Sequence, residues 1–172
     1  MSRRHSERRP GTVETPVADL LECVIQIKGL AETAPRLAVL AGQAPEPRWR
    51  VQPAPGVWAP LEVLAHLADI EVVFGARLRA MLTIDGPPLQ KVDGARLATR
   101  ARYLDWPLAV ALDRFRRRRD DNLELLDACS AEEIGRVGLH PARGPVTVAD
   151  MVALMLAHDT DHLGQIRDRL GL

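Results

Sequence analysis

Two histidines, His158 and His162, lie four residues apart in the segment MLAHDTDHLGQIRDRL. In an α-helix this spacing places both imidazoles on one face, one turn apart, as two ligands of a metal ion require. Met151 and Leu154 fall on the same face, which is therefore predicted to point into the protein core. Taken alone, the pair is equally compatible with two hydrogen-bonded core histidines. The polar end of this face carries Gln165 and Arg169.

A third histidine, His66, lies on a predicted helix that begins near Pro60. The face around it is mostly apolar, so this imidazole is also predicted to point inward. Three inward imidazoles each need a partner for their ring nitrogens, and a divalent metal ion would satisfy one nitrogen of each ring. Three neutral ligands would leave a coordination position open for water or a thiolate. Candidate acceptors that would orient the imidazoles are Asp69 and Asp161, which could equally be solvated helix acids.

The helices that must position these histidines are marked by the helical period of their apolar residues and by local start and stop signals. The first covers about residues 17–43 and is expected to kink or restart near Thr33 and Pro35. A capping box at Thr147 predicts the start of the last helix, and Gly171 predicts its end. This last helix is expected over about residues 147–170, and the second and third over about residues 60–82 and 107–129.

The longest predicted connection covers about residues 84–105 and includes one weakly helical stretch near 94–102. A connection of this length can cross the end of a bundle, so the second and third helices can run parallel. Residues 137–146 are rich in Gly and Pro and predict a loop or a small hairpin. The fold class predicted from these elements is all-α, a four-helix bundle with a long crossover between helices 2 and 3.

The composition favours one domain in a chain of 172 residues and excludes several classes of partner. Because 23 Lys and Arg balance 23 Asp and Glu, we expect neither a nucleic-acid nor a membrane partner. Cys23 and Cys129 are the only cysteines, which fits a reducing cytoplasm. Residues 1–15 are basic and polar, and they predict a disordered N-terminal arm before a domain at 16–172.

An arginine-rich run on the third predicted helix has two interpretations. The run comprises Arg114 and residues 116–119, which are all Arg. Residues 116–119 span about 300° around a helix, so at least one must lean toward the bundle. Arg119, one turn after Phe115, is the candidate to reach the interior and bind an anionic group of a substrate or cofactor. The alternative is a solvated face whose arginines pair with Asp113, Asp120 and Asp121.

The segments GVWAPLEVLAHLADIEVVFGARLRAML and GPVTVADMVALMLAHDTDHLGQIRDRL resemble the two signature helices of the DinB/YfiT-like superfamily. The resemblance covers about residues 17–170 and implies a four-helix bundle with up-down-down-up topology. The motifs that carry the resemblance are His-x-x-Asp-x-Glu at His66, Asp69 and Glu71, and His-x3-His followed by Gln at His158, His162 and Gln165.

Glu71 lies about 140° from His66 around its helix, which predicts an ion pair or a cap rather than a shared ligand role.

The resemblance implies that His66, His158 and His162 bind a divalent metal ion, zinc or nickel. It also implies a homodimer and a metal-dependent enzyme that acts on a small molecule. The reaction would be thiol-dependent S-transfer with bacillithiol or mycothiol, or a related isomerisation or hydrolysis. Arg119 and Gln165 are the candidate cofactor contacts, and no other catalytic residue is assigned. The rival hypothesis is a non-catalytic metal-binding protein of stress response or protein interaction.

Overall fold

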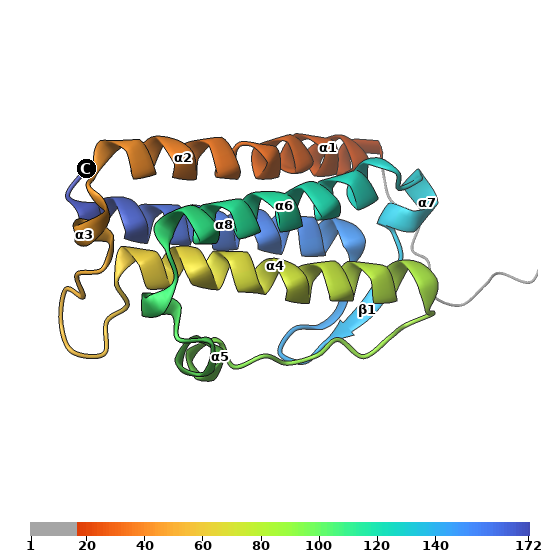
Figure 1. The fold of residues 1–172 in the computed structure, drawn as a ribbon. Coiled ribbons are helices and arrows are strands. Elements are labelled where there is room, and N and C mark those ends of the chain that lie inside the picture. Colours follow the sequence, from red (N-terminus) through yellow and green to blue (C-terminus); the bar gives the residue numbers. More distant parts are fainter. Residues whose placement is uncertain (1–16) are drawn as a thin grey trace, which may run out of the picture.

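Four long helical segments run side by side in the computed structural model, which describes residues 17–172 (Figure 1). The arm predicted at residues 1–15 lies outside the described residues. Between residues 17 and 172, none of the helices combines the length and the apolar character that crossing a membrane requires. The first segment consists of two successive helices, α1 Val17–Ala31 and α2 Thr33–Gln43, and the other three are α4 Pro60–Thr83, α6 Leu108–Asp127 and α8 Val148–Leu170.

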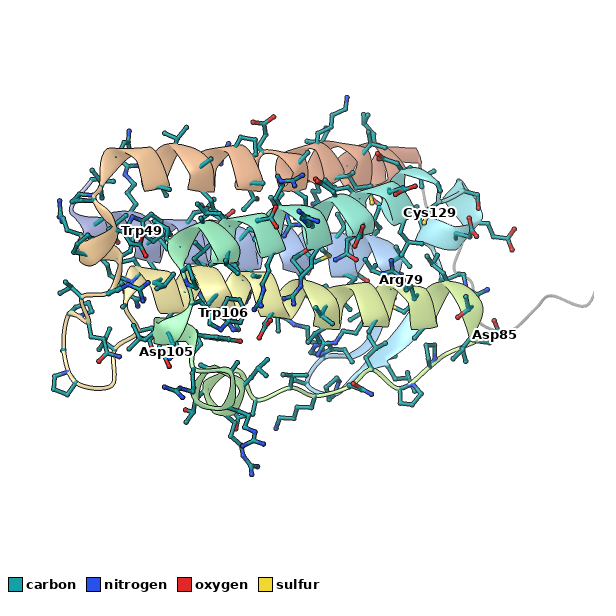
Figure 2. All side chains as sticks on the ribbon, in the orientation of Figure 1. Trp49, Arg79, Asp85, Asp105, Trp106 and Cys129 are labelled. Carbon is teal, nitrogen blue, oxygen red and sulfur yellow. The ribbon has the colours of Figure 1, made fainter. Side chains whose placement is uncertain are left out.

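The long helices have the predicted up-down-down-up topology (Figure 1). α4 and α6 run in one direction, whereas α1, α2 and α8 run in the other. The crossover between α4 and α6 brings the chain back along the bundle through α5, Gly94–Ala101, and a short 3-10 turn, Tyr103–Asp105. Asp105 and Trp106 lie where this crossover meets the start of α6 (Figure 2).

Local capping fixes the ends of the two helices that carry the histidines. Ala59, before α4, has no side-chain acceptor, but the Glu62 carboxylate accepts a hydrogen bond from its N–H at 2.8 Å. Before α8, Thr147 Oγ1 accepts from the Asp150 N–H at 3.0 Å, and the Asp150 carboxylate accepts from the Thr147 N–H at 2.8 Å. Gly171 ends α8 with φ of 68°, a left-handed conformation that favours glycine. The predicted capping box is therefore confirmed.

The predicted hairpin forms beside α4 and holds part of the crossover. The Leu89 N–H donates to Leu139 O at 2.9 Å, and the Leu139 N–H donates to Pro87 O at 2.8 Å. This pairing fixes the first residues after α4, before the chain reaches α5. The antiparallel strands are β1 Val137–His140 and β2 Gly144–Thr147, and the remaining short helices are α3 Glu46–Trp49 and α7 Ala131–Ile134.

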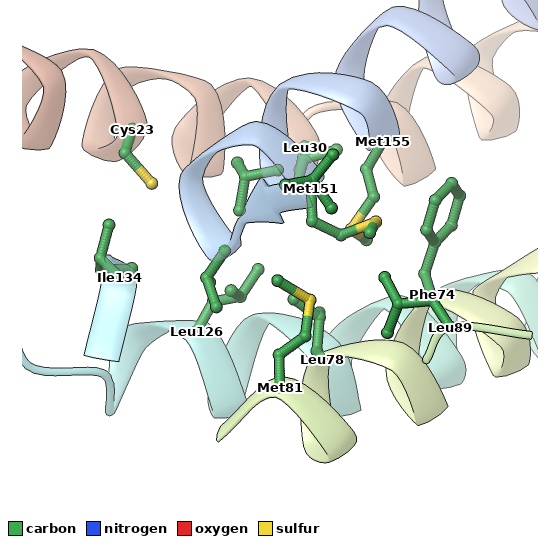
Figure 3. Close-up of a cluster of buried hydrophobic side chains, with 13 residues drawn as sticks. Cys23, Leu30, Phe74, Leu78, Met81, Leu89, Leu126, Ile134, Met151 and Met155 are labelled. Carbon is green, nitrogen blue, oxygen red and sulfur yellow. The ribbon is translucent and has the colours of Figure 1, made fainter. Parts of the chain in front are cut away.

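The apolar core is divided into two main clusters along the bundle axis. Figure 3 shows the first, where side chains of α1, α4, α6 and α8 meet. On α8, Met155 belongs to this cluster and Ile166 to the second, and both histidines of the helix lie between them. The first cluster includes Leu30, Leu78, Leu126 and Met151, and the second includes Trp49, Leu64, Phe115 and Leu170.

Candidate metal centre

The structure brings the three predicted histidines together between α4 and α8. His66 Nε2 lies 3.1 Å from His158 Nε2, and His162 Nε2 also lies 3.1 Å from His158 Nε2. In a tetrahedral zinc site with Zn–N distances of about 2.0–2.1 Å, neighbouring nitrogens lie about 3.3 Å apart. Two of the three pairs of ring nitrogens therefore have nearly the spacing of ligands to one ion, and one ligand atom of each of the three histidines lies within 4.8 Å of the others. Among residues 17–172, no other group of three His, Cys, Asp or Glu side chains converges in this way.

The donor atoms fit a divalent metal ion better than a hydrogen-bonded core cluster. His66 is only 7% exposed, and its Nε2 faces another Nε2 rather than a carboxylate or a carbonyl. Three facing Nε2 atoms cannot all be satisfied by the protons that neutral imidazoles carry. A metal ion would accept all three lone pairs at once, and imidazole suits both zinc and nickel. His158 and His162 are only partly buried, so the centre lies near the surface of the bundle.

Aromatic rings and a close backbone approach hold the imidazoles in place. The Trp58 ring centroid lies 5.1 Å from that of His66, and Phe74 meets His158 edge-on at 5.8 Å. At the start of α5, a Cβ atom on Gly94 would lie 3.1 Å from Cε1 of His66. Glycine at this position therefore lets the crossover helix cover the His66 ring.

Gln165 lies one turn after His162 and is the one predicted cofactor contact that lies at the centre. Its Oε1 is 3.2 Å from His162 Nδ1, a distance at which the amide oxygen accepts a hydrogen bond from the ring N–H. A proton held on Nδ1 leaves the Nε2 lone pair directed toward the other two histidines. Gln165 therefore orients a candidate ligand.

The two aspartates predicted to orient imidazoles do not form those hydrogen bonds. Asp69 instead accepts hydrogen bonds from the Tyr103 hydroxyl at 3.1 Å and from Arg118 Nη1 at 2.7 Å. Asp161 is exposed on α8. The prediction was wrong for Asp69 because helix position alone does not reveal the competing arginine on α6.

Comparison with known proteins agrees with this fold. The sequence profile of the DinB superfamily matches residues 30–166. This chain belongs to the DinB superfamily. A similar solved structure is YfiT from Bacillus subtilis, described as a probable metal-dependent hydrolase with an unusual four-helix bundle topology. It has 18% sequence identity and a TM-score of 0.79 over 96% of this chain and 94% of YfiT. A search of curated proteins finds no match.

Burial keeps the imidazoles of this DinB-superfamily centre neutral. Desolvation lowers the pKa of His66 to about 4 and that of His158 to about 3, and neighbouring histidines lower both further. Desolvation also lowers the pKa of His162, although the hydrogen bond with Gln165 acts in the opposite direction. Neutral imidazoles are the form that binds a metal ion, so no proton must leave before binding at neutral pH.

These pKa shifts predict that the metal-free protein loses stability in mild acid. Because the folded-state pKa of His158 is below the unfolded value of about 6.5, the unfolded chain binds more protons between the two values. Stability is therefore fully present above pH 6.5 and is lost as the pH falls toward 3. Between pH 6.5 and 5 the loss is roughly 2 kcal/mol per imidazole held neutral. Urea denaturation with a chelator should show a shallower decline for His158→Gln, and an equal decline would contradict this origin.

Arg119 does not reach the histidine centre, which corrects its predicted role as a contact for a substrate or cofactor. Its side chain is 1% exposed and lies between two carboxylates, Glu71 on α4 and Asp159 on α8. Four of its hydrogen bonds reach these carboxylates at 2.6–3.1 Å, and a fifth reaches Leu30 O at 2.9 Å. A guanidinium has five N–H donors, so none remains for a substrate. Glu71 forms the predicted ion pair.

Thr33 and Asn122 extend this buried polar network. Thr33 Oγ1 donates to the Asp159 carboxylate at 2.7 Å, and Asn122 Nδ2 donates to Glu71 Oε2 at 3.0 Å. The network therefore joins all four helical segments of the bundle. Sequence reasoning missed Asp159, although it shares a helix face with the buried Met155 and Ile166.

A glycine on α4 makes room for the network and provides a stability prediction. A Cβ atom on Gly75 would lie 2.4 Å from Oδ1 of Asn122, which is buried and held by hydrogen bonds. Gly75→Ala should lower the free energy of unfolding by about 1–2 kcal/mol, because overpacking outweighs the gain in helix propensity. The matched control is Gly164→Ala on α8, where nothing lies within 4 Å. This control should gain about 0.5–1 kcal/mol in thermal or chemical denaturation.

The exposed arginines of the run support the alternative interpretation, whereas Arg118 is partly buried and donates to Asp69 and to Ala68 O. Arg116 and Arg117 pair with Asp113 on the exposed side of α6, and Arg116 also pairs with Asp120. Arg114 lies over the Trp106 ring, 4.1 Å from its centroid. The run is therefore divided between solvent, an aromatic contact and the buried network.

Proposed function

We propose that this DinB-superfamily protein is a metal-dependent enzyme whose divalent ion, zinc or nickel, is held by His66, His158 and His162. The observation that carries the proposal is the convergence of three neutral imidazoles, two of which are partly exposed. The Nε2 atoms of His66 and His162 each lie 3.1 Å from Nε2 of His158. When bound there, a divalent ion supplies a Lewis acid that lowers the pKa of a water or thiol at its open position.

The residues of the chain would hold and shield this reaction site. Gln165 directs the His162 ring, while Trp58 and Gly94 cover the His66 ring. Two reaction types suit an open position on such an ion. One is attack by a low-molecular-weight thiol, bacillithiol or mycothiol, on a small electrophile. The other is hydrolysis, which the description of YfiT favours.

The deciding experiment combines metal analysis with turnover. Purified protein is expected to bind one equivalent of zinc or nickel and to consume thiol with a panel of electrophiles, or to hydrolyse a panel of esters and amides. His162→Ala should lose both properties, whereas His140→Ala, in the hairpin and outside the centre, should keep both. Stoichiometric metal without turnover would instead support the rival, a metal-binding stress-response or interaction protein. No bound metal in the wild-type protein would overturn both.

We also propose that the protein is a cytoplasmic homodimer. Two thiols that form no disulfide with each other, Cys23 and Cys129, support a reducing compartment. On α1 three apolar side chains are exposed, Leu21 by 62%, Val24 by 48% and Ile25 by 55%, and they support association through this face. Sedimentation velocity of the wild type and of Leu21→Glu tests the dimer, which the variant should weaken.

A further inference from the structure

Arg169 lies two turns after His162 on α8 and forms no hydrogen bond or ion pair within residues 17–172. It follows His162 by seven residues, so both lie on one face of α8, with Gln165 between them. Within residues 17–172, no carboxylate forms an ion pair with Arg169, and its buried Nη1 has no hydrogen-bond partner. A buried guanidinium donor without an acceptor is costly, and such a group is suited to an anion supplied by a ligand.

The direction of helical side chains brings this guanidinium toward the histidines. Each Cα–Cβ bond in an α-helix tilts toward the N-terminus, so the Arg169 side chain covers the turn that precedes it. That turn contains Gln165, whose Oε1 contacts His162 Nδ1. The charge of Arg169 also acts on His162, whose pKa is lowered first by burial and further by this arginine.

The charge balance around the centre points in the same direction. Three neutral imidazoles leave the two positive charges of a divalent ion uncompensated. Of the acids next to the histidines along the helices, Asp159 pairs with Arg119, Asp69 pairs with Arg118, and Asp161 is exposed. The two positive charges of the ion and the charge of Arg169 would therefore outweigh the carboxylate of Asp161, which favours a negatively charged ligand.

We propose that Arg169 binds a carboxylate of the molecule on which the three-histidine centre acts. The planar guanidinium fork matches the two oxygens of a carboxylate. The substrate or thiol would thus carry two recognition groups, one at the open metal position and a carboxylate at Arg169. This inference rests on the proposed metal centre and adds a class of substrate to it.

The test uses the full-length protein loaded with cobalt(II), whose visible spectrum reports thiolate binding. The probes are ω-mercaptocarboxylates of increasing chain length, each compared with the mercaptoalcohol of the same length. In the wild type, at least one carboxylate should bind about tenfold more tightly than its neutral counterpart. Arg169→Gln should bind cobalt as before and reduce this ratio to about one.

Arg167→Gln is the matched control, because Arg167 lies in the same last turn of α8 but is exposed and donates to Leu172 O. It removes the same charge near the same helix end and should keep the preference for the carboxylate. Equal binding of both probe types by the wild type, or an unchanged ratio in Arg169→Gln, would overturn the role of Arg169 while leaving the metal centre intact. Failure of the wild type to bind cobalt would overturn the proposed function as well.

Discussion

Replacing Arg119 by methionine should lower the free energy of unfolding by about 3–5 kcal/mol. The substitution keeps a side chain of similar length but leaves the Glu71 and Asp159 carboxylates buried without a cation. Both carboxylates are at most 1% exposed, so water cannot replace the lost guanidinium without opening the bundle. Urea denaturation followed by circular dichroism measures the change.

Two further variants separate the buried ion pairs from a general loss of arginine. Arg116→Met removes an exposed arginine of the same helix and should cost less than about 1 kcal/mol. Combining Arg119→Met with Glu71→Gln and Asp159→Asn should recover part of the loss, because it removes the uncompensated charges. If Arg119→Met costs no more than Arg116→Met, the buried pairs do not determine stability.

The network and the metal centre are connected through the rotation of α8 about its own axis. Asp159 directly follows His158, so these side chains point about 100° apart around the helix. Arg119 and Thr33 hold Asp159 from α6 and α2, while His158 faces His66 on α4. A helix fixed by Asp159 on one side has its histidines fixed on the other. The network is thus placed to keep the imidazoles at a constant spacing.

Much of the fold could be predicted because its signals are local. The restart at Thr33, the first-turn Pro60 and the capping box at Thr147 each act within a few residues, and all three mark observed helix starts. The length of the crossover allowed α4 and α6 to run parallel, and the resemblance to the superfamily implied that they do. The inward faces of His66 and His158 followed from helical periodicity in the same way.

The buried network could not be predicted in full because its partners are far apart in the sequence. Thr33 and Asp159 are separated by 126 positions, and Arg119 lies 48 positions from Glu71 and 40 from Asp159. Periodicity indicates that a charged residue points inward, but it does not indicate which charge it meets. Arg119 was therefore correctly predicted to reach the interior, whereas its partner there was expected to be a ligand and is the protein itself.

His66→Gln should lower the affinity for zinc at least about a hundredfold, since even residues that only orient a ligand change affinity by about 10–100-fold. The same change should appear as lost stabilisation, because an ion that binds only the folded state favours folding. Zinc at a thousand times its Kd should raise the free energy of unfolding of the wild type by about 4 kcal/mol. At that concentration the variant should gain much less.

The comparison with the metal-free protein makes this prediction specific to the centre. Without metal, Nε2 of His66 lies 3.1 Å from Nε2 of His158, so replacing His66 removes at most one hydrogen bond between imidazoles. The metal-free proteins should therefore differ less in stability than the zinc-loaded ones. His140→Gln, in the hairpin, should respond to zinc as the wild type does. If His66→Gln retains the full stabilisation by zinc, the ion binds elsewhere, and the spacing of the three rings has another cause.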